Sequence, residues 1–102
     1  MIARLCYEWT TAEEGDTYEF VVATKVLPSF QQLEGYRGAH LLREDRGSET
    51  EFATLTLFED IEAVRRFAGE DYQSAVVPIE ARELLARFDD RSKHYEIILT
   101  PP

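Results

Sequence analysis

The chain has 102 residues, a length typical of one domain that buries roughly 65% of the surface of its unfolded chain. Its hydrophobic fraction of 44% excludes a disordered polypeptide, and no apolar run approaches the ~20 residues that span a bilayer. The formal net charge of −9 repels phosphate groups and anionic lipid, so we expect no nucleic-acid or membrane partner. Arg4, Glu8 and Glu13 interrupt any signal-peptide core, so we expect a cytoplasmic protein.

The first third of the chain predicts a strand followed by a helix. Apolar and polar residues alternate over 2–9, and Cys6 lies within this strand as a buried thiol rather than a nucleophile. Thr10 or Thr11 would cap the helix, which Pro28 then ends or bends.

The rest of the chain predicts a hairpin, two helices and a last strand, with no linker or repeat that would divide the single domain 1–102. Residues 39–44 and 51–58 are expected to pair around a turn. One helix begins at Asp60, a second covers 79–88, and the last strand covers 94–99. Strand, helix, strand, strand, helix, strand is the split βαβ order of an α+β ferredoxin-like domain.

Side-chain alternation divides the strands into two faces. We expect the helices to cover the first face, which carries Ala3, Leu5, Tyr7, Trp9, Ala39, Leu41, Ala53, Leu55, Leu57, Tyr95, Ile97 and Leu99. The second face mixes apolar and charged residues, and it carries Ile2, Arg4, Cys6, Glu8, His40, Leu42, Glu44, Phe52, Thr54, Thr56, Phe58, His94, Glu96 and Ile98. Such a face suits neither open solvent nor a dry core, so we expect it to pack on a second copy in a symmetric homodimer.

A distinctive segment runs from Phe67 to Pro78, where a helical pattern stops at Gly69 and Tyr72 is expected at the junction with the next helix. Together with Met1-Ile2-Ala3-Arg4, Trp9-Thr10-Thr11 and Gly35-Tyr36-Arg37-Gly38, it resembles the antibiotic biosynthesis monooxygenase family of the dimeric α/β-barrel (ferredoxin-like) superfamily. The resemblance covers nearly the whole chain and specifies the fold better than the substrate.

The resemblance implies a four-stranded antiparallel sheet, with the sheets of two copies closing into one barrel. It also implies a cofactor-independent monooxygenase, which would use dioxygen to oxidise a small aromatic or phenolic substrate of the polyketide or quinol kind. The alternative is a non-catalytic dimeric module of the same fold that binds a small molecule or serves in stress.

Five residues are candidates for the site. Tyr72 and His40 would act in catalysis, by orienting the substrate oxygen and accepting a proton. Trp9, Arg4 and Tyr18 would bind the substrate in a pocket between the helices and the sheet. Alternatives stay open, since the aromatic residues and histidines are also ordinary core residues, and Arg4 is either a structural ion pair or an anion-binding group.

No Cys/His cluster with metal-ligand spacing, nucleotide loop or serine-nucleophile motif is present, so we expect neither metal nor cofactor. Heme-degrading relatives would have an asparagine on the first strand, a tryptophan at the position of Phe67 and a histidine within 72–78, and all three are missing. A cavity of several hundred Å³ beneath Tyr72, beside enclosed polar groups, would favour the enzyme. An interface filled by Tyr7, Trp9, Tyr18 and Tyr95 would favour the module.

Overall fold

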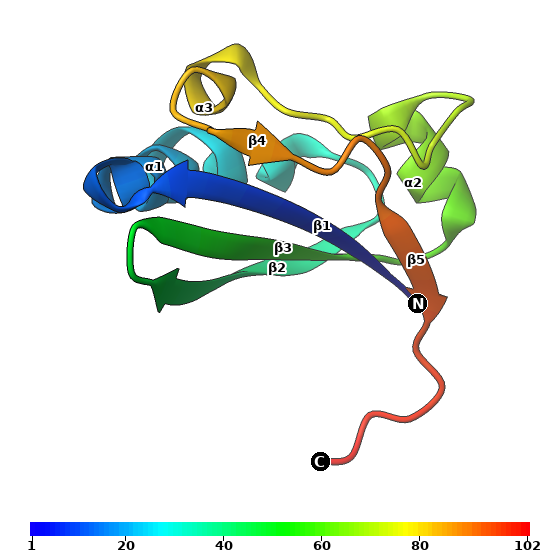
Figure 1. Ribbon diagram of the computed structural model, residues 1–102. Coiled ribbons are helices and arrows are strands. Elements are labelled where there is room, and N and C mark those ends of the chain that lie inside the picture. The colour runs from blue at the N-terminus through cyan, green and yellow to red at the C-terminus, as the bar shows by residue number, and fades with distance from the viewer.

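The computed structural model describes all residues, 1–102, as an antiparallel sheet with helices packed on one face (Figure 1). Three long strands, β1 (Ile2–Thr11), β2 (Tyr36–Arg46) and β3 (Glu49–Phe58), lie in the order β2-β3-β1. Two short strands, β4 (Arg87–Phe88) and β5 (Lys93–Glu96), pair with the free edge of β1. The expected α+β, ferredoxin-like split βαβ fold is confirmed, although two short strands stand where the sequence predicted one longer one.

The first helical segment is less regular than expected. It consists of a 3-10 turn η1 (Ala12–Glu14), helix α1 (Gly15–Val21), a π-helical turn η2 (Val22–Val26) and a second 3-10 segment η3 (Leu27–Gln32). The expected threonine cap is wrong, because the Thr10 hydroxyl donates to the carbonyl of Thr11 and Thr11 makes no capping bond. Pro28 lies in the first turn of η3 and has no N–H to continue an α-helical ladder.

Helix α2 (Ile61–Ala68) forms where the sequence predicts it. The Asp60 carboxylate caps it by accepting a 2.9 Å hydrogen bond from the amide of Ala63, and Gly69 ends it at a φ of 92°. No helix follows Gly69 directly, so the expected helix junction at Tyr72 is wrong. The next helix, α3 (Ile79–Arg82), is also shorter than predicted, because Arg87 and Phe88 pair with β1 instead.

The expected assignment of the sheet faces is also wrong. The helices cover the face that carries Arg4, Glu8, Phe52 and Phe58, all of them buried. Phe52 joins a core cluster with Tyr18, Val22, Val26 and Ala81, whereas Phe58 packs with Ala63 and Val64. The sequence analysis expects such charged groups to be incompatible with a core, but Arg4 and Glu8 each make buried hydrogen bonds that offset their desolvation. Phe52 is therefore a core residue and does not lie between two copies.

The opposite face of the sheet, here called the outer face, has no covering layer within one chain. Strand pairing places these residues on it: Ala3, Leu5, Tyr7, Trp9, His40, Leu42, Ala53, Leu55, Leu57 and Tyr95. Leu42 is 49% exposed and Tyr95 is 52% exposed. Beyond β5, the last residues extend away from the body of the molecule (Figure 1). None of the helices is both long enough and apolar enough to cross a lipid bilayer.

Candidate functional site

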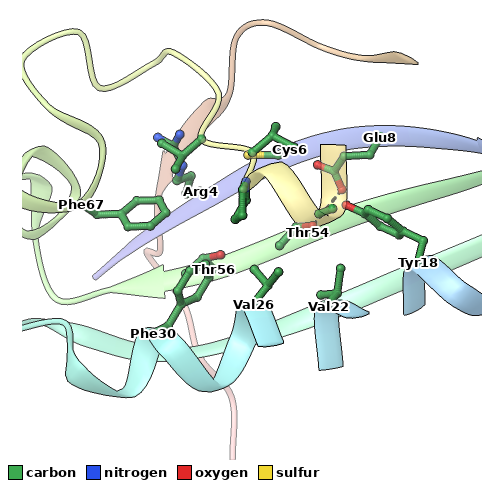
Figure 2. Close-up of a pocket in the computed structure, with 14 residues that line it drawn as sticks. Arg4, Cys6, Glu8, Tyr18, Val22, Val26, Phe30, Thr54, Thr56 and Phe67 are labelled. Carbon is green, nitrogen blue, oxygen red and sulfur yellow. Dashed lines mark hydrogen bonds between the residues drawn. The ribbon is translucent and has the colours of Figure 1, made fainter. Parts of the chain in front are cut away.

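A cavity of about 50 Å³ lies between β1, β3 and the helical layer (Figure 2). The strands provide its polar wall, formed by Arg4, Cys6, Glu8, Thr54 and Thr56. Helices and the segment before α3 provide a mainly apolar wall, formed by Tyr18, Val22, Val26, Phe30, Phe67, Val76, Val77, Pro78 and Ala81. The cavity has room for a few water molecules and is smaller than the several hundred Å³ of a typical ligand pocket.

Arg4 occupies one end of the cavity and is only 2% exposed. Its Nη1 donates to the carbonyl oxygen of Tyr72, and its Nη2 donates to the carbonyl oxygen of Ser74 at 2.9 Å. The guanidinium also lies over the ring of Phe67, 5.5 Å from its centroid. Burial lowers the pKa of Arg4 below its usual value, yet an arginine in a protein stays protonated.

His94 lies on β5, next to Arg4 on the neighbouring strand β1. Its Nε2 is 2.9 Å from Nη1 of Arg4, and the rings of His94 and Tyr72 pack edge to face with centroids 5.1 Å apart. Burial, with a smaller contribution from the Arg4 charge, lowers the pKa of His94 to about 4. The imidazole is therefore neutral at pH 7.

Glu8 occupies the other end of the cavity and is 5% exposed. Its Oε1 accepts a 2.8 Å hydrogen bond from the hydroxyl of Thr54, and its carboxylate also accepts one from the hydroxyl of Tyr18. Burial is the main reason that the pKa of Glu8 rises to about 7, despite the opposing effect of these hydrogen bonds. Burial and the neighbouring Glu8 raise the pKa of Tyr18 too, so that its phenol stays a hydrogen-bond donor.

Cys6 lies between Arg4 and Glu8 on the same face of β1. Its Sγ is 2.7 Å from the hydroxyl oxygen of Ser92, and burial raises the pKa of the thiol above its usual value. A protonated, buried thiol is a poor nucleophile, which agrees with the packing role expected from the sequence. Glu8 follows Arg4 by four steps along the strand, which corresponds to about 13 Å between their Cα atoms.

The five residues predicted for the site do not come together. Arg4 and Tyr18 line the cavity. Tyr72 lies outside its lining and contributes a backbone carbonyl to Arg4. Trp9 lies on the outer face, where its Nε1 donates to Glu51 and the Arg87 guanidinium lies 4.0 Å from a ring centroid.

His40 is exposed on the outer face, so neither it nor Trp9 reaches this cavity within one chain. Sequence reasoning missed Glu8 as a site residue. The sequence does contain a signal for it, because a glutamate and an arginine lie on the same face of an otherwise apolar strand. Glu8 was missed because that face was expected to contact a second copy of the chain.

The sequence matches no protein-family model and no curated protein. Its fold does match solved structures. MhuD, a heme-degrader from Mycobacterium tuberculosis solved with two hemes in its active site, aligns over 100% of both chains with a TM-score of 0.69 at 18% identity. A proposed antibiotic biosynthesis monooxygenase from Deinococcus radiodurans aligns over 100% of this chain and 97% of its own, with a TM-score of 0.69 at 14% identity.

SnoaB, a cofactor-independent oxygenase from Streptomyces nogalater, aligns over 99% of this chain and 97% of its own, with a TM-score of 0.59 at 17% identity. The chain has the antibiotic biosynthesis monooxygenase fold. The resemblance inferred from the sequence is thus confirmed at the level of the fold, which leaves the chemistry to be argued from the site.

The cavity residues do not fit a heme of the kind that MhuD binds. No histidine lines the cavity, whose volume is about 50 Å³, and Nε2 of His94 is already engaged by Arg4. Nowhere in the chain do three or more His, Cys, Asp or Glu residues gather in a group able to hold a metal ion.

Proposed function

We propose that the protein is a monooxygenase that needs no cofactor and uses dioxygen to oxidise a small phenolic aromatic. The observation that carries this proposal is the pair of enclosed polar groups, Arg4 and Glu8, at the two ends of a cavity with an apolar wall. Three of the four aromatic residues that would have filled the interface of a binding module, Tyr7, Trp9 and Tyr95, lie on the outer face instead.

Glu8 is the general base in this proposal. Its pKa of about 7 leaves it partly ionised at neutral pH and still basic enough to accept a proton from an activated C–H or O–H group. Tyr18 and Thr54 hold the carboxylate in place by donating to it. The structure thus favours Glu8 over His40 as the residue that removes the proton.

The reaction balances without a reductant. After Glu8 removes a proton, the substrate anion gives one electron to dioxygen, and the resulting radical and superoxide combine to form a peroxide. Glu8 returns its proton to this peroxide, and the O–O bond breaks as the same carbon loses its second hydrogen. One oxygen becomes a carbonyl of the product and the other leaves as water, so that a CH₂ group and O₂ yield C=O and H₂O. An apolar, water-poor cavity protects the reactive intermediates.

Substrate entry requires the cavity to enlarge. The segment 76–78 forms part of its wall and belongs to neither a helix nor a strand. Val76 in this segment is 43% exposed, so the wall is thin here. An entering aromatic ring would displace this segment more readily than the hydrogen-bonded strands.

The expected homodimer remains part of the proposal, but through the outer face. An apolar sheet face without a covering layer favours association, and packing of two such sheets would form the barrel implied by the resemblance. A stable interface of this kind buries on the order of 1,200 Å² or more.

The small volume of the cavity, about 50 Å³, favours the second candidate, a dimeric module that binds a small molecule without reaction.

A cytoplasmic location is proposed for either function from the sequence alone.

Oxygen consumption by chelator-treated protein, measured with hydroquinones and anthrone-like phenols, tests the enzyme. Glu8→Gln should lower kcat/KM by about 10²-fold or more, whereas the exposed Glu13→Gln serves as a charge-matched control and should change little. Unchanged activity in Glu8→Gln would reject the mechanism, and activity that disappears with the chelator would reject cofactor independence. Inactivity of the wild type across the whole panel would favour the module.

A further inference from the structure

Arg4 is a buried cation that lacks a carboxylate partner. The chain carries 20 acidic residues, and six of its arginines form ion pairs, yet none of these pairs includes Arg4. Its nearest partners are two backbone carbonyls and a neutral imidazole. Hydrogen bonds to these neutral groups reduce the desolvation cost of Arg4 but do not neutralise its charge. In a chain with this many acidic residues, a buried arginine without a carboxylate partner points to an anion from outside the chain.

Arg4 also keeps donors for such an anion. Nη1 uses both of its hydrogens, on Tyr72 and His94, whereas Nη2 uses one, on Ser74. Nε and the second hydrogen of Nη2 take part in none of these bonds, and the thiol of Cys6 is a further neighbour of the guanidinium. Both Arg4 and Cys6 line the cavity (Figure 2), so an anion bound there would lie next to the guanidinium.

The other acid in the cavity does not neutralise Arg4. Glu8 lies about 13 Å along the strand, and its own hydrogen bonds come from Thr54 and Tyr18. The end of the cavity near Arg4 therefore has a positive charge beside an aromatic surface, the ring of Phe67.

We infer that this cavity binds a small aromatic molecule as its monoanion, with an ionised carboxylate or phenolate oxygen on the guanidinium of Arg4 and the ring against Phe67. This inference concerns the same cavity as the proposed function and rests on the proposed function in no other respect. The bound anion would point the far end of its ring toward Glu8, which names the substrate class more closely: an aromatic that is already charged at one end before Glu8 acts on the other.

Binding of matched probes tests the inference directly. Isothermal titration compares 2-naphthoate with 2-naphthamide, and 4-nitrophenolate with nitrobenzene, so that each anion has a neutral counterpart of nearly the same shape. The first pair reports a carboxylate and the second a phenolate. For at least one pair, wild-type protein should bind the anion tenfold or more tightly than the neutral compound.

Arg4→Gln should abolish this preference, and Arg37→Gln should keep it, because Arg37 is an exposed arginine paired with Glu59 away from the cavity. If Arg4→Gln fails to fold, the arginine ¹⁵Nε resonances of the wild type test the inference instead. The Arg4 signal should shift with the anion and stay in place with the neutral counterpart.

Equal affinity for both members of both pairs, absence of binding, a preference that survives in Arg4→Gln, or shifts confined to other arginines would each overturn the inference. Charge-selective binding without oxygen consumption would keep it and reject the proposed enzyme. Oxygen consumption without charge selectivity would do the reverse.

Discussion

Nη1 of Arg4 lies 2.9 Å from Nε2 of His94, and this single contact fixes the protonation of the imidazole. A guanidinium can only donate, so Nε2 of His94 accepts and the ring hydrogen must reside on Nδ1. Nδ1 is buried and has no hydrogen-bond partner. His94 therefore helps to aim Arg4 as a neutral group and is unsuited to accept a proton.

The first prediction concerns the titration of His94. Its pKa of about 4 lies below the ordinary value of 6.5, so the stability that its neutral form contributes is complete above pH 6.5 and is lost as the pH falls through 4. The carbon-bound ring hydrogens of His94 should keep their NMR shifts from about pH 8 to about pH 5. His40→Gln assigns the signal, and a midpoint near the ordinary value would contradict the Arg4 contact.

The second prediction concerns the stability effect of Glu8. Its pKa is about 7 in the folded protein against the ordinary value of 4.5, so folding favours the protonated form and stability falls as the pH rises from 4.5 to 7. The full difference corresponds to about 3 kcal/mol. Chemical denaturation across this range should show that the wild type loses stability relative to Glu8→Gln as the pH rises, because His94 affects both proteins alike. Parallel curves would contradict the raised pKa.

The third prediction separates Tyr72 from Glu8. Tyr72→Phe keeps the backbone carbonyl that binds Arg4 and the ring that packs on His94. Since the phenol lies outside the cavity lining, kcat/KM should stay within about threefold of wild type. A loss of about a hundredfold would show that the phenol contacts the substrate, as the sequence analysis expected.

The fourth prediction concerns the homodimer. Sedimentation should give about twice the 11.8 kDa chain mass at micromolar concentration. Leu42→Asp should dissociate the dimer without unfolding the chain, because Leu42 is 49% exposed in one copy and a carboxylate there is costly only when a second sheet covers it. Phe20→Asp is the control, since Phe20 is 64% exposed on the helical side. A wild type that sediments as a monomer would refute the dimer.

The fifth prediction concerns Gly35, at the turn that leads into β2. Its φ is 87°, and an added Cβ would lie 2.5 Å from the Cβ of Ala63. Gly35→Ala should therefore cost about 3 kcal/mol or more in unfolding free energy. Gly47→Ala, with a φ of 74° and open space around it, should cost only about 1 to 2 kcal/mol for the backbone alone. Equal losses would show that the contact with Ala63 relaxes freely.

The sequence predicted the order of elements because local signals set most of their ends. Asp60 and Gly69 bound α2 as expected, since capping depends on a residue and its near neighbours. The helix expected over 79–88 ended early because Arg87 and Phe88 gain pairing with β1, a long-range contact that periodicity does not report.

The site was harder to predict, because alternation tells which residues share a face and not which layer covers that face. Arg4 and Glu8 were correctly grouped with Phe52, but their charge argued against a helix-covered core. Contacts between segments that are distant in the sequence overturn that argument. The Tyr72 and Ser74 carbonyls reach Arg4 from a segment about 70 residues away, and Thr54 reaches Glu8 from β3.

Strand β1 contributes side chains both to the cavity and to the outer face of the sheet. Its even-numbered residues Arg4, Cys6 and Glu8 border the cavity, whereas its odd-numbered Tyr7 and Trp9 face outward. Deleting one residue near its start would turn every later side chain to the other side, exposing acid and thiol while forcing an indole inward. A change in the length of this strand would therefore disturb the cavity and the outer face together, whereas an insertion in the exposed turn at Gly47 and Ser48 would leave the alternation along β1 unchanged.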